Sequence, residues 1–200
     1  MLSVGLMCSA YDGVARLFAE ESADLFNSLS FSARYQLINN YSSSEKSEVR
    51  NDLQTTESRI LKLTPNHMVI ATSSVRTVEL KLIPQGKNDS IVAVIETVAT
   101  PVKDSKLSFY DMKWNKLDAA KFIKMPELGD FIVSSVPKEK RQELMSAVNF
   151  AMIEMAFEGD TLVARCNLQD FYLGDDFKNY AKWVAKRIEY NINKGVLKRK

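Results

Sequence analysis

The sequence predicts an α+β fold in which a largely antiparallel sheet packs against helices. Strand-like segments rich in Val, Ile, Leu, Thr and aromatic residues follow one another between Arg59 and Trp114. The links between them are short and turn-forming, which leaves no room for the crossover helices that parallel strands need. Helical patterns lie on both sides of this region, so helices are available to cover the sheet.

The chain is expected to open with two helices. The first begins at Asp12, and the second follows a serine cap at Ser28 or Ser30. Residues 41–51 are polar and predict an exposed connection. The apolar stripes are Val14, Leu17, Phe18, Leu25 and Phe26 in the first helix and Phe31, Tyr35, Leu37 and Ile38 in the second.

The sheet region alternates in polarity along several of its strands. Residues 77–83 place apolar side chains on one side and Glu79 and Lys81 on the other, which predicts one core face and one partly solvated face. Residues 91–98 are apolar on both faces except at Glu96, so this strand belongs near the middle of the sheet. The predicted strands are 59–63 leading into 67–72, then 77–83, 91–98 and 106–114.

After a linker with some helical character at 117–123, a further helix is predicted from Pro137, because proline suits a first helical turn. Leu144, Met145 and Val148 would form its inner side. Residues 150–157 and 161–168 then predict a hairpin about Glu158, Gly159 and Asp160, since glycine tolerates the positive φ of such loops. In its second strand, alternation predicts that Cys166 is buried.

A last helix is capped by Asp175 or Asp176, with Phe177, Tyr180, Ala181, Val184 and Ile188 along one face. Residues 187–192 also alternate, and a turn at 193–195 favours a final hairpin over a continued helix. Helices followed by antiparallel strands thus occur twice. Residues 11–200 are interpreted as one α+β domain, and two similar lobes dividing near 115–125 are left open.

The opening residues 1–10 are apolar and end in small residues, as the end of a secretory signal does. We interpret them as the remnant of a signal peptide, which predicts a periplasmic or secreted protein. An apolar first strand or a frayed terminus is the alternative. No run approaches the ~18 apolar residues that a membrane helix requires.

The 27 basic and 25 acidic residues are scattered with mixed sign and leave a net charge of +2. No basic face is available to neutralise a row of phosphates, which excludes nucleic acid as a partner. One histidine and two cysteines, Cys8 and Cys166, make no metal or redox motif. No phosphate-binding loop, dinucleotide fingerprint or nucleophile elbow is present. We therefore predict a chain that folds without a metal, a disulfide or a cofactor.

Two neighbouring segments, Ile95–Ser105 and Phe109–Trp114, resemble those of a family of small uncharacterised proteins. The family is catalogued only as a domain of unknown function and is exported by gut-dwelling Gram-negative anaerobes. The resemblance covers most of residues 17–198 and implies an exported, mixed α and β protein with no assigned activity or site residues. The chain departs from the family where a complete signal peptide is expected. Further matching segments are Arg34–Tyr41, Val49–Leu53, Leu61–Pro65, Val78–Pro84 and Phe171–Leu173.

Catalytic chemistry has few candidates. His67 is the single imidazole, and we interpret it as a turn or strand-edge residue without a catalytic role. Glu96 and Glu154 form the one carboxylate pair worth considering, because a buried carboxylate has a raised pKa and can act as a general acid. No aromatic platform for a sugar accompanies them. A carboxylate-dependent hydrolase is therefore the alternative hypothesis rather than the first.

The first hypothesis is a non-catalytic binding or inhibitor-like module that recognises another protein or a cell-envelope ligand. Tyr110 and Trp114 are its candidate binding residues, because alternation sets them opposite Phe109 and large amphipathic rings dominate interfaces. The alternative is that both rings belong to the core. An open aromatic or apolar sheet face would favour the binding module, and a concave pocket with two converging acids would favour the hydrolase. The oligomeric state is not predicted.

Overall fold

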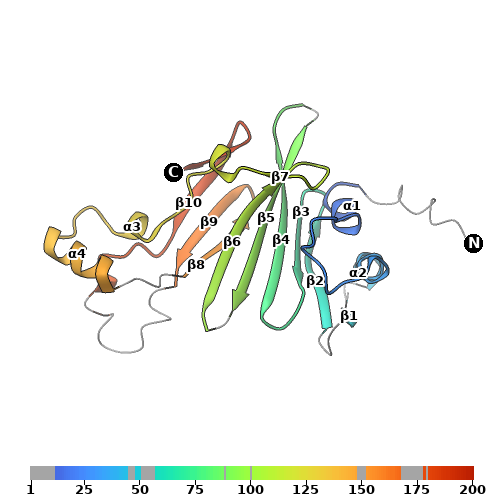
Figure 1. The fold of residues 1–200 in the computed structure, drawn as a ribbon, viewed down its shortest axis with the longest axis horizontal. Coiled ribbons are helices and arrows are strands. Elements are labelled where there is room, and N and C mark those ends of the chain that lie inside the picture. The colour runs from blue at the N-terminus through green and yellow to red at the C-terminus, as the bar shows by residue number, and fades with distance from the viewer. Residues whose placement is uncertain are drawn as a thin grey trace, which may run out of the picture. The chain divides into compact units, whose positions relative to one another are not determined.

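The computed structural model describes residues 12–44, 48–50, 57–87, 89–99, 101–147, 152–167, 178 and 180–200. It contains a seven-stranded sheet in the order β1-β2-β3-β4-β5-β6-β7 and a four-stranded sheet in the order β11-β10-β9-β8 (Figure 1). The chain divides into two compact units. The first comprises residues up to Glu96 and Ser108–Leu117, and the second comprises Thr97–Leu107 and Asp118–Lys200.

Most elements are strands. The first unit holds α1 (Val14–Ala19), α2 (Phe31–Ser44), β1 (Glu48–Arg50), β2 (Glu57–Thr64), β3 (His67–Ala71), β4 (Arg76–Pro84) and β7 (Lys116–Leu117). Residues of β5 (Ser90–Ala99) and β6 (Lys103–Tyr110) belong to both units. The second unit holds the 3-10 turn η2 (Ala119–Lys121), α3 (Leu128–Phe131), α4 (Lys138–Ala147), β8 (Ile153–Glu158), β9 (Thr161–Cys166), β10 (Ile188–Asn193) and β11 (Val196–Arg199).

In the larger sheet the strands follow one another in sequence order. The pairs β1–β2, β2–β3, β3–β4 and β6–β7 are antiparallel. Short turns join β2 to β3 and β3 to β4, and short turns are compatible only with this direction. The predicted, largely antiparallel sheet is therefore confirmed. β5 has a neighbour on each side, as its two apolar faces predict.

Helices α1 and α2 lie beside the first strands of this sheet: α1 contacts β3 and β4, and α2 contacts β1 and β2 (Figure 1). Their apolar side chains form one cluster with a face of the sheet. Phe18 and Phe26 meet edge to face in it, with ring centroids 4.8 Å apart. The fully buried members include Val14, Phe18, Leu37, Met68, Ile70, Val78, Leu80, Val92 and Val94.

The start of α1 docks directly on the turn between β2 and β3. The backbone N–H of Val14 donates to Pro65 O at 3.0 Å. Gly13 has a φ of 62°, and a Cβ at this position would lie 2.0 Å from Pro65 O. Both the positive φ and the close approach exclude other residues here.

Helix α1 is shorter than the sequence predicts. It ends at Ala19, and Leu25 and Phe26 are buried from the irregular segment that follows. The Glu21 carboxylate accepts from the backbone N–H of Leu25 at 3.0 Å, and Asp24 has a φ of 60°. Side-chain bonds of this kind offer the backbone an alternative to a helix, which the apolar spacing does not reveal.

Strand β4 corrects a second prediction. Glu79 and Lys81 were expected on a partly solvated face, but they are 7% and 3% exposed. The apolar residues on the other side of the strand are buried as well, so both faces of β4 are covered. Alternation of polar and apolar residues therefore did not mark a solvated face here.

Strand β6 ends earlier than predicted, at Tyr110. The chain then turns, because the Asp111 carboxylate accepts from the backbone N–H groups of Lys113 and Asn115 at 2.8 and 2.9 Å. Trp114 has a φ of 65° inside this turn. Aspartate commonly forms such turns. Here the turn ends the strand, so the alternation of side-chain directions predicted for residues 106–114 does not continue past Tyr110.

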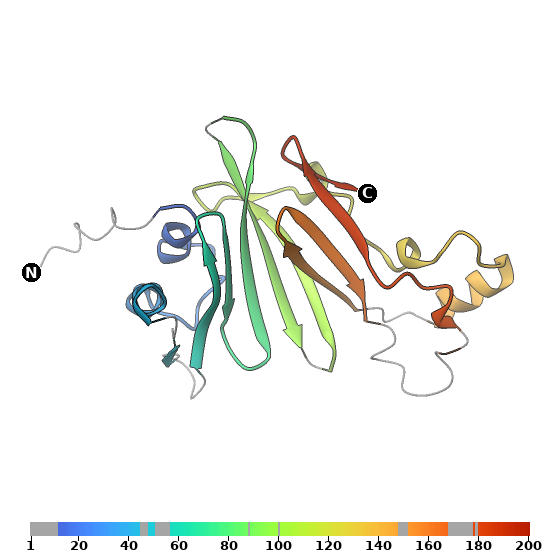
Figure 2. The ribbon, with the colours of Figure 1, turned by 180° about the vertical axis from the view of Figure 1, so that it is seen from behind.

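The second unit contains two hairpins in one sheet, and Figure 2 shows their orange and red strands side by side. The β8–β9 hairpin turns at Gly159, which has a φ of 65°, as predicted. The favoured final hairpin is also confirmed: β10 and β11 are joined by Lys194 and Gly195, both with positive φ, as a type I′ turn requires. Ile188 begins β10, so the predicted last helix does not extend that far.

Helix α4 follows Pro137 as predicted, but only part of its predicted inner side is buried. Leu144 is buried and Met145 is 43% exposed. Val148 lies outside the described residues, as do the predicted cap residues Asp175 and Asp176. None of the helices in the described ranges is long and apolar enough to cross a membrane.

Cys166, the last residue of β9, is 7% exposed, so its predicted burial is confirmed. Val163, on the other side of the strand, is buried as well.

Candidate functional site

A shallow, open pocket of about 400 Å³ lies in the second unit. It is formed where the end of β5 and the beginning of β6 meet β8 and the residue after β9. Its volume falls in the range of sites for small ligands. The residues that line it are Ala99, Pro101, Val102, Lys103, Glu154 and Asn167.

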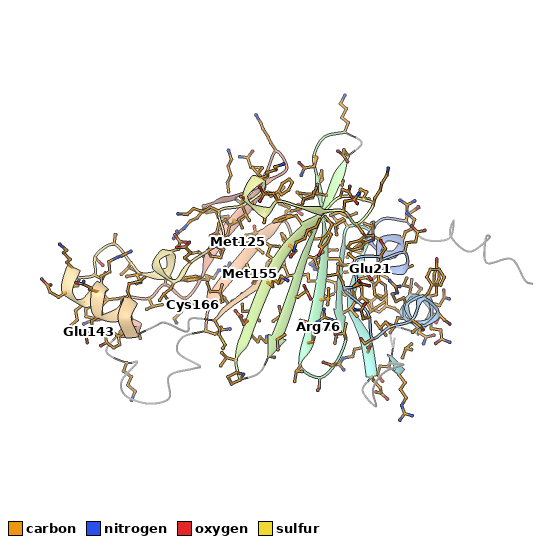
Figure 3. The ribbon with its side chains drawn as sticks, viewed as in Figure 1. Glu21, Arg76, Met125, Glu143, Met155 and Cys166 are labelled. Atoms are coloured by element: carbon orange, nitrogen blue, oxygen red, sulfur yellow. The ribbon has the colours of Figure 1, made fainter. Side chains whose placement is uncertain are left out.

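Next to the pocket, side chains of β6 accept hydrogen bonds from the edge of β8. Asp104 accepts a hydrogen bond from the backbone N–H of Ile153 at 3.1 Å, and Ser105 Oγ accepts from that of Met155 at 2.9 Å. Ser105 Oγ also lies 2.8 Å from Thr97 Oγ1. An unpaired strand edge is thereby satisfied, and Figure 3 labels Met155 on this strand.

An ion pair forms one wall of the pocket. The Lys103 ammonium donates to Glu154 Oε1 at 2.8 Å, with side chains 56% and 21% exposed. Exposed pairs of this kind contribute only about 0–1 kcal/mol. Separating the Lys103 ammonium from the Glu154 carboxylate therefore costs little free energy.

Asn167 is held beside the pocket by two hydrogen bonds. Its Nδ2 donates to the backbone oxygen of Lys103 at 2.6 Å, and its backbone N–H donates to Met152 O at 2.9 Å. Because a carbonyl oxygen can only accept, the first bond fixes which side of the amide is Nδ2. The Oδ1 atom accepts no hydrogen bond from the described residues, so it is available to a ligand.

The two carboxylates of the hydrolase hypothesis both have basic partners. Glu154 pairs with Lys103, and Glu96 accepts from Arg76 Nη2 at 2.7 Å. Glu96 belongs to the first unit and Glu154 to the second. Glu154 is the single acid among the described residues that line the pocket.

In the first unit, charged side chains bind backbone carbonyls of the segment after α1. Arg76 Nη2 also donates to Leu25 O at 3.1 Å, and Arg34 Nη1 donates to Phe18 O and Glu21 O at 3.2 and 3.0 Å. Burial lowers the pKa of Arg34, and the nearby Glu21 carboxylate opposes that shift. Figure 3 labels Glu21 and Arg76. Arg34 thus binds one carbonyl in the last turn of α1, that of Phe18, and the two arginines bind two more carbonyls in the segment that follows.

His67 begins β3 directly after the turn at residues 65–66, which agrees with the strand-edge position predicted from the sequence. It is buried there, at 3% exposed, and its Nε2 lies 2.5 Å from Glu79 Oε1. The register of β3 and β4 sets Lys81 opposite His67. These three buried polar residues form one cluster on the strand pair.

Tyr110 and Trp114 are both 7% exposed and belong to the core of the first unit. Their rings meet edge to face with centroids 5.5 Å apart, and Trp114 Nε1 donates to Leu17 O at 3.2 Å. Burial raises the pKa of Tyr110, and Glu96 and Glu21 add to that shift. The structure therefore agrees with the alternative in which both rings are core, and the exposure that a recognition role requires is not found.

The family described as "Protein of unknown function (DUF3256)" matches residues 9–196. The chain belongs to this family. The match spans nearly the same residues as the resemblance seen in the sequence and confirms a family without an assigned function. No curated protein matches the chain.

A solved structure, that of a domain of an uncharacterized protein from Porphyromonas gingivalis W83, is similar to this DUF3256 chain. The two share 20% sequence identity and a TM-score of 0.84, over 95% of this chain and 100% of that one. The likeness shows a shared fold, and it carries no site residue.

Sequence reasoning on this DUF3256 chain singled out Glu154 but missed Lys103 and Asn167. Asn167 lies within the predicted strand 161–168, whose pattern gave no reason to choose it. Asn167 and Lys103 are 64 residues apart in the chain, so only the fold brings them together.

Metal coordination has no candidate in the described ranges, where no group of three or more His, Cys, Asp or Glu side chains is placed to hold an ion.

Proposed function

We propose that this DUF3256 protein is an exported, non-catalytic module that binds a ligand in the pocket of Lys103, Glu154 and Asn167. The observation that carries the proposal is the composition of that pocket. The Lys103 ammonium can donate hydrogen bonds, and the Glu154 carboxylate, whose charge Lys103 balances, can accept them. Asn167 adds an amide oxygen as a further acceptor, and Ala99 and Val102 add apolar surface beside these groups. Few, well-placed polar groups beside apolar surface are typical of binding sites.

The pocket supports binding better than hydrolysis. Glycoside hydrolysis by carboxylates needs two acids, one of them protonated. The described lining contains one acid, Glu154, and its carboxylate is paired with the Lys103 ammonium 2.8 Å away. The second acid that such a mechanism needs is not found among the described lining residues.

Export is part of the proposal and is supported by the apolar residues 1–10 and their small C-terminal residues. Fractionation of cells that express the complete natural gene tests it. Recovery of the protein from the cytoplasm alone contradicts it.

The binding role is tested by NMR on the isotope-labelled full chain with three classes of probe: amino acids, hexoses and short-chain carboxylates. We expect at least one class to shift the backbone resonances of Ala99, Val102 and Lys103 in a saturable way, with no product signals. Product signals that disappear in Glu154→Gln would instead establish the hydrolase. Absence of saturable shifts with every class would refute the binding role.

A further inference from the structure

We propose that the pocket selects a zwitterion, specifically a free α-amino acid, an inference that rests on the proposed binding function. The deciding feature is that Lys103 Nζ and Glu154 Oε1 are opposite charges only 2.8 Å apart. Covalent geometry holds the ammonium nitrogen and the carboxylate of an α-amino acid within about 3 Å of each other as well. The two charge pairs therefore have matching spacing.

The bound arrangement follows from this match. The ligand carboxylate accepts from the Lys103 ammonium, and the ligand ammonium donates to the Glu154 carboxylate. Each protein charge keeps a partner, so no charge is left unpaired on binding. Asn167 Oδ1 supplies a further acceptor for the ligand ammonium, which has three hydrogens to donate.

Other ligand classes fit less well. A simple anion would lie beside the Glu154 carboxylate, and a simple cation beside the Lys103 ammonium, so each meets a like charge. A neutral sugar has no charge to exchange with the ion pair, and none of the described lining residues is aromatic. A longer peptide carries its terminal charges at opposite ends and cannot present both to one ion pair.

The ligand side chain has a defined place. Ala99, Pro101 and Val102 provide the apolar part of the lining. Because the pocket is shallow and open, we expect room for a small side chain and weak binding. L-alanine is therefore the probe, with an expected Kd on the order of 1 mM.

The test is a titration of the labelled full chain, followed at the backbone resonances of Ala99, Val102 and Asn167. L-alanine is compared with N-acetyl-L-alanine, which lacks the ammonium, with L-alaninamide, which lacks the carboxylate, and with glucose. Saturable shifts with L-alanine, and affinities at least roughly 10-fold weaker for both blocked forms, support the proposal.

Variants with matched controls locate the site. Lys103→Met and Glu154→Gln should each weaken L-alanine binding by at least roughly 10-fold. Lys106→Met, on the same strand as Lys103, and Glu158→Gln, on the same strand as Glu154, lie outside the pocket lining and should bind as the unaltered chain does. Dispersed spectra of all four variants show that they are folded.

The outcomes separate the two proposals. Saturation by glucose but not by L-alanine overturns the zwitterion and leaves the binding function standing. L-alanine binding that survives both Lys103→Met and Glu154→Gln also overturns it. No saturation by any probe removes the binding function and the zwitterion together.

Discussion

In the first unit, Arg34 and Arg76 each bind a carboxylate and a backbone carbonyl of the segment after α1. In the second unit, Arg165 pairs with Glu158, and Arg199 binds the carboxylate and the backbone oxygen of Asp130 at the surface. Side chains in the first group are 12% and 28% exposed, and those in the second are 35% and 45% exposed. Buried charges that bond to backbone are costly to remove, and exposed pairs are not. Of these four arginines, the two in the first unit are thus the more buried, and their bonds are expected to contribute more to folding stability.

The largest effect is expected for Trp114→Ala in the first unit. The change removes a buried ring from the core and the hydrogen bond to Leu17 O, so the free energy of unfolding should fall by about 3–5 kcal/mol. Denaturant unfolding measures it. Trp183→Ala, at a half-buried ring of the second unit, is the control and should cost less. If Trp114→Ala lowered the free energy of unfolding by less than about 1 kcal/mol, the ring would not be a core residue, and Trp114 would again be a candidate recognition residue.

Arg76→Met should have the next largest effect. It removes the bonds to Glu96 and Leu25 O, and hydrogen bonds of charged groups are worth about 1–3 kcal/mol. Arg76→Lys keeps the positive charge but lacks the planar guanidinium with its several N–H donors. It should therefore recover only part of the free energy of unfolding that Arg76→Met loses. Equal stability of Arg76→Met and the unaltered chain in urea would show that these bonds do not hold the segment.

A smaller effect, confined to alkaline pH, is expected at Tyr110. Because its pKa is raised in the folded chain, chiefly by burial, deprotonation favours unfolding. The stabilising contribution is complete below the ordinary tyrosine pKa of about 10 and is lost as the pH rises through the folded pKa. Tyr110→Phe should therefore flatten the fall of stability above about pH 10.

Urea midpoints measured across alkaline pH test this expectation. Tyr190 in the second unit also has a raised pKa, chiefly through burial, so Tyr190→Phe serves as the comparison. Identical alkaline profiles for Tyr110→Phe and the unaltered chain would contradict the role of Tyr110.

The smallest effect is expected for Arg165→Met in the second unit. Its pair with Glu158 is 2.5 Å long, but the side chains are 35% and 48% exposed. Such pairs contribute about 0–1 kcal/mol, and salt screens them. A double-mutant cycle with Glu158→Gln isolates the pair energy. A coupling above about 2 kcal/mol would remove the contrast between the two units.

The sequence predicted elements wherever the structure follows local rules. The β8–β9 turn at Gly159 and the final hairpin were both predictable, because each turn contains a glycine, which readily adopts a positive φ. The early end of α1 was not, since it depends on Glu21 and Arg34 bonding to backbone that apolar spacing does not describe. Burial of Glu79 and Lys81 was also missed, because their polarity was taken as a sign of solvent.

The candidate site was less predictable than the fold. Glu154 was named for a reason, hydrolysis, that the pocket does not support, and its partner Lys103 lies 51 residues earlier in the chain. Trp114 was placed on the strand of Tyr110 by extending the alternation through Asp111, whose side chain instead forms a turn. A contact between distant segments decides the first case, and a local turn at Asp111 that the alternation did not take into account decides the second.

The bond from Trp114 Nε1 to Leu17 O has a consequence for the order of folding. Within the larger sheet each strand pairs with its neighbour in sequence, so the sheet can grow by closing short loops. The Trp114 bond closes a loop of 97 residues and gains nothing until both of its ends are structured. We expect it to form after the rate-limiting step, so that Trp114→Phe speeds unfolding and leaves the folding rate nearly unchanged in stopped-flow measurements. A slowed folding rate would instead place this contact in the nucleus.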